Sequence, residues 1–191
     1  MVDVKRVTGV EVYSFISQKG GTGKSTLARQ FAVLNSTSLL IDRDPQQTTA
    51  KWWNRRRELD PAPEYPDLID LNSTTLTAAV EALRRKTDGL LFIDTRPAVD
   101  EPVAEAARVS DLVIIPVRPS PDDLEAVGET LKIILNKPAA LVVNAAKTGR
   151  RALSARAALS RYPVPVCPVH IADRTVYLDA SPSGRPHPHT Y

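Results

Sequence analysis

A glycine-rich stretch near the N-terminus constrains this chain more than any other feature of its sequence. Residues 18–26 read Gln-Lys-Gly-Gly-Thr-Gly-Lys-Ser-Thr, between an apolar run at 10–17 and a helical pattern at 27–34. A strand that leads through glycines into a helix directs several backbone N–H groups and the positive end of the helix dipole at one point. The stretch therefore predicts a loop that binds a polyphosphate.

The spacing departs from the ordinary phosphate loop, G-x-x-x-x-G-K-[ST], because Gln18 replaces the first glycine and a second lysine, Lys19, precedes the glycines. Lys24 is expected to lie between the β- and γ-phosphates, and the Ser25 hydroxyl to hold Mg²⁺. The residues that we expect to bind the nucleotide phosphates are Gly20, Gly21, Thr22, Gly23, Lys24, Ser25 and Thr26.

This lysine-first loop resembles the deviant Walker A box of the ParA/MinD family of P-loop ATPases. The resemblance implies that Lys19 acts on the nucleotide of a partner subunit. A second match is Asp42-Arg-Asp-Pro-Gln, which is similar to the family's D-x-D-P-Q segment. There the resemblance implies that Asp44 positions the attacking water and that Asp42 lies near the metal. The alternative interpretation is that these aspartates cap the helix that begins at Thr48.

Further matches lie downstream. The apolar run at 89–93 ends in Asp94, a Walker B pattern in which the carboxylate binds a magnesium-bound water. Asn144 stands where the family has an asparagine that reads adenine, although an asparagine that only begins a loop would give the same pattern. Ala172 and Asp173 begin a segment similar to the one beside the adenine. Arg43 and Arg96 depart from the family pattern.

The alternation of apolar runs with helical patterns predicts the fold. Six or seven apolar strands between helices indicate an α/β fold, a single doubly wound, mostly parallel sheet with the nucleotide at the carboxyl ends of the strands. We expect residues 1–180 to form one P-loop ATPase domain and the Pro- and His-rich residues 181–191 to be a flexible tail. The expected helices are 25–34, 48–58, 73–86, 102–108, 124–135, 148–162 and 173–180.

Several classes of protein are excluded by composition. No run of 18 apolar residues and no charged-then-apolar leader occurs, so neither a membrane span nor a secretory signal is predicted, and we expect a cytoplasmic protein. The single cysteine, Cys167, excludes an internal disulfide and a four-cysteine metal or cluster site within one chain.

Basic residues gather in clusters although the net charge is only +3. At 100° per residue, Arg150, Arg151 and Arg161 fall within a sector of roughly 100° on the helix expected at 148–162. A second cluster is Arg84, Arg85 and Lys86. We interpret both clusters as DNA-phosphate contacts, and the alternative is that they are solvated helix ends.

Taken together, the motifs resemble those of ParA-type DNA partition ATPases over residues 10–184. The resemblance implies an enzyme that uses ATP and Mg²⁺, forms an ATP-sandwiched homodimer, binds DNA non-specifically on the nucleoid, and segregates a plasmid or chromosome with a ParB-like activator. Its implied catalytic residues are Lys19, Lys24 and Asp44. A MinD-like membrane-cycling ATPase would need an amphipathic C-terminal helix, which the proline-rich tail cannot form. A small-molecule phosphotransferase would usually keep the ordinary first glycine.

Overall fold

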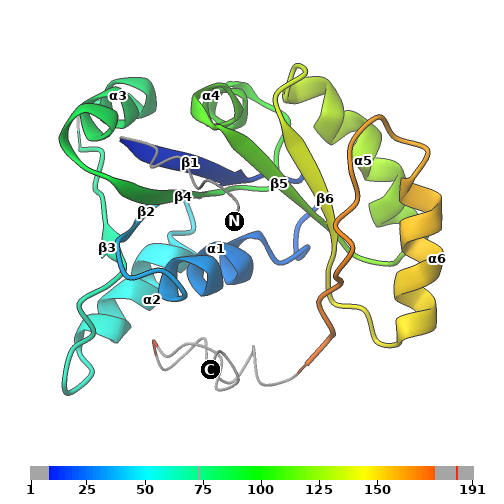
Figure 1. Ribbon diagram of the computed structural model, residues 1–191, viewed down its shortest axis with the longest axis horizontal. Coiled ribbons are helices and arrows are strands. Elements are labelled where there is room, and N and C mark those ends of the chain that lie inside the picture. Colours follow the sequence, from blue (N-terminus) through cyan, green and yellow to red (C-terminus); the bar gives the residue numbers. More distant parts are fainter. Residues whose placement is uncertain (1–8, 73, 175–183, 185–191) are drawn as a thin grey trace, which may run out of the picture.

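Six strands form one sheet in which every neighbouring pair is parallel, in the order β3-β2-β4-β1-β5-β6 (Figure 1). The structure is a computed structural model that describes residues 9–72, 74–174 and 184. The predicted α/β fold with a parallel sheet is thereby confirmed. The strands are β1 (Val10–Phe15), β2 (Ser38–Arg43), β3 (Asp67–Leu68), β4 (Gly89–Thr95), β5 (Leu112–Val117) and β6 (Ala139–Val143).

Helices cover both faces of the sheet (Figure 1). The helices are α1 (Lys24–Val33), α2 (Thr48–Arg57), α3 (Leu76–Lys86), α4 (Glu101–Val109), α5 (Pro121–Ile133) and α6 (Gly149–Leu159). α1 and α2 bury one face with a cluster that includes Phe15, Leu40 and Trp52. α3 and α4 pack on the other face through Val12 and Ile93, and α5 and α6 extend that layer over β5 and β6.

The alternation of side chains along the strands decides which face each site residue can reach. In β4, Leu91 and Ile93 face α3 and α4, whereas Phe92 packs in the cluster under α1 and α2. Asp94 follows in the same alternation as Phe92, and its side chain contacts Thr49 of α2. The Walker B aspartate is therefore directed to the side of the sheet on which α1 begins.

The carboxyl ends of five neighbouring strands carry polar residues, most of which the sequence singled out. β1 leads into the glycine-rich loop, β2 into Asp44, β4 ends beside Asp94, and β6 leads into Asn144. β5 is followed directly by Arg118. Because the strands are parallel, these ends share one edge of the sheet, which is where open α/β sheets bind ligands.

Several predicted boundaries need correction. The helix expected at 124–135 begins at Pro121, because Ser120 accepts a hydrogen bond from the Asp123 N–H and proline is favoured in the first helical turn. The helix expected from Ser73 or Thr74 is capped by Thr75. The helix expected to reach Tyr162 ends at Leu159.

The segment after α6 returns along the edge of the sheet, as its two prolines indicated. Val166 bridges to Leu141 of β6 and Ala172 bridges to Ala146, both in parallel. Asp173 and Arg174 are not helical, and the rest of the helix expected at 173–180 lies outside the described residues. The expected tail at 181–191 also lies outside them, apart from Gly184. No helix in the described part of the chain has the length and apolar character needed to span a bilayer.

Candidate nucleotide-binding site

The glycine-rich loop has a backbone that only glycine fits at its last turn. Gly23 precedes α1 with φ 97°, in the left-handed region. A Cβ at Gly23 would lie 2.1 Å from Nδ2 of Asn144. That amide donates a hydrogen bond to the Thr22 carbonyl at 2.7 Å. Asn144 thus braces the loop from the end of β6, and its expected contact with adenine stays a prediction.

Lys24 is a buried cation at the mouth of the loop, with 5% of its surface exposed. Its Nζ donates to the Lys19 carbonyl at 3.1 Å. Burial lowers the pKa of the amine, and the carboxylates of Asp94 and Asp44 oppose that shift. The Lys24 ammonium is therefore shielded from water, and it would attract an anionic ligand at the mouth of the loop. Lys19 itself is exposed.

Asp94 is fully buried and one of its oxygens lacks a donor among the described residues. Oδ2 accepts a hydrogen bond from the Thr49 hydroxyl at 2.7 Å, whereas Oδ1 has no partner in that part of the chain. Burial raises the pKa of this carboxyl to about 6, and its interactions with Thr49 and Ser25 oppose that shift. A buried carboxylate oxygen without a donor, next to the Ser25 hydroxyl, fits Mg²⁺ or a water bound to it.

Asp42 is engaged by the backbone at the start of α2. Its Oδ1 accepts from the N–H of Asp44 at 3.0 Å, and its Oδ2 accepts from the N–H groups of Thr49 at 3.0 Å and Ala50 at 2.9 Å. The capping interpretation therefore describes Asp42. It pairs with Asp94 in the register of β2 and β4, so it lies near the expected metal position. A direct metal contact by Asp42 stays a prediction.

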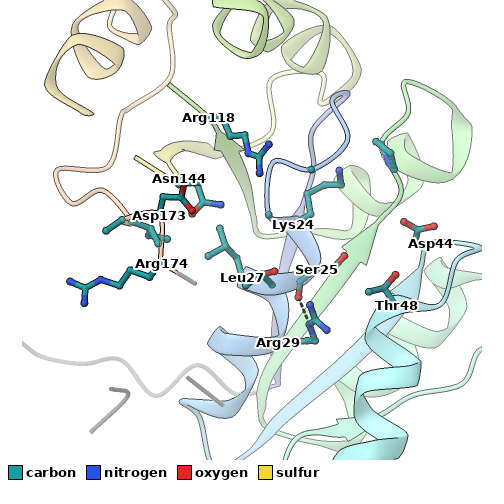
Figure 2. Close-up of a pocket in the computed structure, with 17 residues that line it drawn as sticks. Lys24, Ser25, Leu27, Arg29, Asp44, Thr48, Arg118, Asn144, Asp173 and Arg174 are labelled. Atoms are coloured by element: carbon teal, nitrogen blue, oxygen red, sulfur yellow. Dashed lines mark hydrogen bonds between the residues drawn. The ribbon is translucent and has the colours of Figure 1, made fainter. Parts of the chain in front are cut away.

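A cleft of about 490 Å³ opens over the loop, a volume suited to a nucleotide. Asp44 and Thr48 line one side, and Asn144, Asp173 and Arg174 line the other (Figure 2). The structure also places Gly21, Gly23, Lys24, Ser25, Thr26 and Ala172 in this lining, and their contact with a nucleotide stays a prediction. Gly20 and Thr22 belong to the loop but not to the lining. Asp44 accepts a hydrogen bond from the Gln46 N–H at 2.9 Å.

No group of three or more His, Cys, Asp or Glu side chains arranged to hold a metal occurs in the described part of the chain. Magnesium does not require such a group, because it usually keeps several waters and binds one or two protein ligands together with substrate phosphates. Ser25 and Asp94 supply a donor set of that kind.

The sequence interpretation did not assign three residues to this region. Thr49 donates to Asp94, Arg118 lines the cleft, and Arg29 is buried beneath Ser25. Arg29 Nε donates to the Ser25 carbonyl at 2.9 Å, and its guanidinium lies 5.7 Å from the centre of the Trp52 ring. Only the spacing of Arg29, one turn after Ser25, could have drawn attention to it.

The two arginines that depart from the family pattern form ion pairs with α4. Arg43 lies 3.6 Å from Glu105, and Arg96 pairs with Asp100, the residue that caps α4. Both guanidinium groups are thus directed to structural carboxylates rather than to the cleft.

The predicted DNA-binding residues do not form one surface. α3 and α6 lie at opposite ends of the sheet, so Arg84, Arg85 and Lys86 are far from Arg150 and Arg151 (Figure 1). Arg84 is paired with Asp111 at 2.8 Å. The assignment of Arg161 to one sector of the helix is wrong, because α6 ends at Leu159. Its guanidinium instead lies 4.9 Å from the Tyr162 ring centre.

Arg150 and Arg151 are exposed beside a groove formed with Pro119 and Pro121.

Comparison with known proteins shows that most of the chain matches one family of nucleotide-binding domains. The model of the CobQ/CobB/MinD/ParA nucleotide binding domain matches residues 13–186. This range includes the loop, Asp42, Asp44, Asp94 and Asn144.

Two relatives are similar over about two thirds of the chain. Maintenance of carboxysome distribution protein A of Gloeobacter kilaueensis is 32% identical over 125 residues, 63% of this chain and 55% of that protein. Protein ParA of Rhizobium radiobacter is 29% identical over 132 residues, 65% of this chain and 56% of that protein. The matched part thus spans little more than half the length of each relative.

Solved structures share the fold at identities of 20% or less. Apo McdA from Cyanthece aligns with a TM-score of 0.73 and 18% identity, covering 93% of this chain and 91% of that one. A putative plasmid partition protein of Borrelia burgdorferi, bound to AMPPNP, aligns with 0.70 and 20%, covering 92% and 90%. The pNOB8 ParA bound to nonspecific DNA aligns with 0.62 and 17%, covering 80% and 74%.

Proposed function

The chain belongs to the CobQ/CobB/MinD/ParA family of nucleotide-binding domains, and from this premise we propose that it is a DNA partition ATPase. It binds and hydrolyses ATP with Mg²⁺, dimerises around the nucleotide, and binds DNA without sequence preference. The observation that best supports the proposal is that two charged side chains are buried at the same phosphate loop. Lys24 is 5% exposed, and the fully buried Asp94 keeps an oxygen without a donor among the described residues.

In this proposal the loop amides and Lys24 bind the phosphates, and Ser25 with Asp94 holds Mg²⁺ or its water. When bound, Mg²⁺ neutralises charge on the phosphates. Asp44, on the opposite wall of the cleft from Asn144, orients the attacking water (Figure 2). Lys19 reaches the nucleotide of a second subunit, which its exposed position allows. Phosphoryl transfer of this kind works by positioning and charge neutralisation, so no covalent nucleophile is needed.

Partition also needs partners outside the cleft. We assign DNA-phosphate contacts first to Arg150 and Arg151, because both are exposed on one helix end. Arg85 and Lys86 are secondary candidates, and Arg84 and Arg161 are weaker because each is already engaged. A ParB-like protein would stimulate hydrolysis, and the ATP-bound dimer would be cytoplasmic and associated with the nucleoid. The similarity to a ParA and to a plasmid partition protein supports this role.

A second candidate is the positioning of a protein cargo on the nucleoid. The 32% identity to a carboxysome distribution protein favours it. Both candidates share the ATP and DNA steps and differ in the cargo. They are separated by following a plasmid and a fluorescent protein cargo in cells that lack this protein, since only the true cargo would lose its even spacing.

The proposed activity is tested by measuring phosphate release from ATP and Mg²⁺ by the full chain, with and without unrelated DNA duplexes. Wild-type protein should hydrolyse ATP slowly and faster with DNA and activator. Lys24→Ala should not bind ATP, because the triphosphate loses a buried cation in a site built for negative charge. Asp44→Ala should bind ATP but hydrolyse it poorly, since loss of a water-orienting carboxylate raises the barrier without emptying the site.

The same set of proteins separates the two lysines. Lys19→Ala should bind ADP as well as wild type does but fail to dimerise with ATP, measured by light scattering. Arg108→Ala is a matched control, because Arg108 pairs with exposed Glu101 on α4, away from the cleft. Near-normal ATP affinity of Lys24→Ala in titration calorimetry would contradict the site assignment. Dimerisation of Lys19→Ala at wild-type affinity would remove its role across the dimer.

A further inference from the structure

Arg118 carries a charge at the cleft that no described residue neutralises. The neighbouring arginines are engaged: Arg96 pairs with Asp100, and Arg29 is buried against Ser25 and Trp52. Within the described ranges, no carboxylate pairs with Arg118 and no acceptor bonds its guanidinium, although the residue lines the cleft. A cation that lines a cleft without such a partner is available to an anionic ligand.

The position of Arg118 places this charge over the phosphate loop. It directly follows Val117, the last residue of β5, and β5 pairs with β1, the strand that leads into the loop. Its Nη1 would lie 3.6 Å from a Cβ built on Gly21. Figure 2 shows the guanidinium directed at the loop on the side where Lys24 lies. A phosphate bound at the loop amides would therefore come within reach of both cations.

The backbone beneath this side chain is fixed. The Ser120 N–H donates to the Arg118 carbonyl at 2.9 Å, and the Asn144 N–H donates to the Val117 carbonyl at 2.8 Å. Pro119 and Pro121 restrict the chain on the far side. The side chain is exposed, so only its own rotamers must be ordered when a ligand binds.

We propose that Arg118 contacts the phosphates of the nucleotide bound in its own subunit. This inference rests on the proposed nucleotide binding. The planar guanidinium offers two parallel N–H groups to phosphate oxygens, whereas the Lys24 ammonium acts as a point charge. Arg118 therefore adds directional recognition of the polyphosphate to the loop. The opposite end of the lining, with Ile171, Ala172 and Asp173, is left for the base.

The test measures binding rather than turnover. A fluorescent ADP is displaced from the full chain by unlabelled ADP, by a slowly hydrolysed ATP analogue and by inorganic tripolyphosphate, in the presence of Mg²⁺. Arg118→Ala should weaken tripolyphosphate and the ATP analogue by about tenfold to a hundredfold, the range of a hydrogen bond to a charged group. Arg118→Lys should restore part of the affinity, because it keeps the charge without the paired donors.

Three outcomes distinguish the possible roles of Arg118. Arg108→Ala, which removes an arginine far from the cleft, should bind all three competitors as wild type does. If Arg118→Ala matches that control, the inference is overturned. If it weakens ADP but leaves tripolyphosphate unchanged, Arg118 contacts the base and the phosphate assignment is wrong. Failure of wild-type protein to bind any nucleotide would instead overturn the proposed function. Unfolding temperatures of the variants check that each is folded.

Discussion

Asp94 combines complete burial with a negative charge, and its titration should be visible in the stability of the protein without Mg²⁺. Burial raises its pKa from 3.8 to about 6. Between these values the folded state binds more protons than the unfolded state, so the free energy of unfolding falls as the pH rises through this window. Well above pH 6 the full destabilisation is present. Mg²⁺ is expected to relieve it by binding the carboxylate.

Replacing Asp94 with Asn removes this titration. At about pH 8, in EDTA and without nucleotide, Asp94→Asn should raise the free energy of unfolding by up to about 3 kcal/mol, and the gain should shrink to roughly half at about pH 5. Urea denaturation followed by circular dichroism at several pH values measures the difference. A difference that does not change with pH would show that the Asp94 charge is not strained by burial.

The sequence indicated which residues would meet at one site where chemistry dictates a pattern. Lys24, Ser25 and Asp94 were expected together, and lie together, because a phosphate loop and a strand that ends in a carboxylate have fixed spacings. Arg118 and Thr49 were not, because their roles depend on which strand lies beside β1 and which helix faces β4. Those neighbours are set by sheet order and by helix packing, which no local pattern records.

At the scale of elements, α2 depends on a carboxylate that belongs to the strand before it. Asp42 accepts three backbone N–H groups, two of them from the first turn of the helix. An anion at a helix N-terminus satisfies donors that the helix cannot, and it interacts favourably with the dipole. Asp42 therefore holds α2, and with it Thr49, against the site.

Asp42→Ala should lower the free energy of unfolding by about 1–3 kcal/mol, because buried N–H groups lose an ionised acceptor. The measurement is urea denaturation without Mg²⁺ or nucleotide. Asp44→Ala is the matched comparison, since within the described residues Asp44 accepts one N–H, at an exposed position, and should change stability less. Equal stability of the two variants would argue against the capping role.

The sequence predicted which segments form helices and strands more reliably than it predicted the residues at which they begin and end. Buried apolar runs made the strands visible, and the runs at 10–17 and 89–93 correspond to β1 and β4 within about two residues. β3 is the shortest strand, and only Asp67 and Leu68 pair with β2. Helix starts depended on which hydroxyl becomes the cap, and three adjacent candidates, Ser73, Thr74 and Thr75, satisfy the same pattern. Only the packing of Leu76 in the core selects Thr75.

At the scale of the molecule, DNA binding should require the nucleotide-bound dimer. Two arginines on one subunit neutralise few phosphates, and a two-fold dimer doubles their number without any new kind of interaction. Arg150→Ala with Arg151→Ala should weaken binding to unrelated duplexes evenly and reduce the salt slope by about 1 for each phosphate that is no longer neutralised. Arg84→Ala should have a smaller effect, because Asp111 already offsets its charge.

Fluorescence anisotropy at several salt concentrations, with a slowly hydrolysed ATP analogue, measures both the affinity and the salt slope. The Arg108→Ala control should behave as wild type. If the double variant keeps its affinity and slope, α6 is a solvated helix and the DNA surface lies elsewhere.

Residues 118–121, which lead from β5 into the first turn of α5, line both the nucleotide cleft and a second groove. Arg118 lines the nucleotide cleft, while Pro119 and Pro121 line the groove beside Arg150 and Arg151. Any shift of this rigid segment on nucleotide binding would therefore change the geometry of both sites. Thermodynamic linkage makes such a coupling between the two binding affinities reciprocal. If ATP raises the affinity for DNA by a given factor, DNA must raise the affinity for ATP by the same factor. The residence time of the protein on DNA would then depend on the bound nucleotide, and the DNA would itself slow the release of that nucleotide.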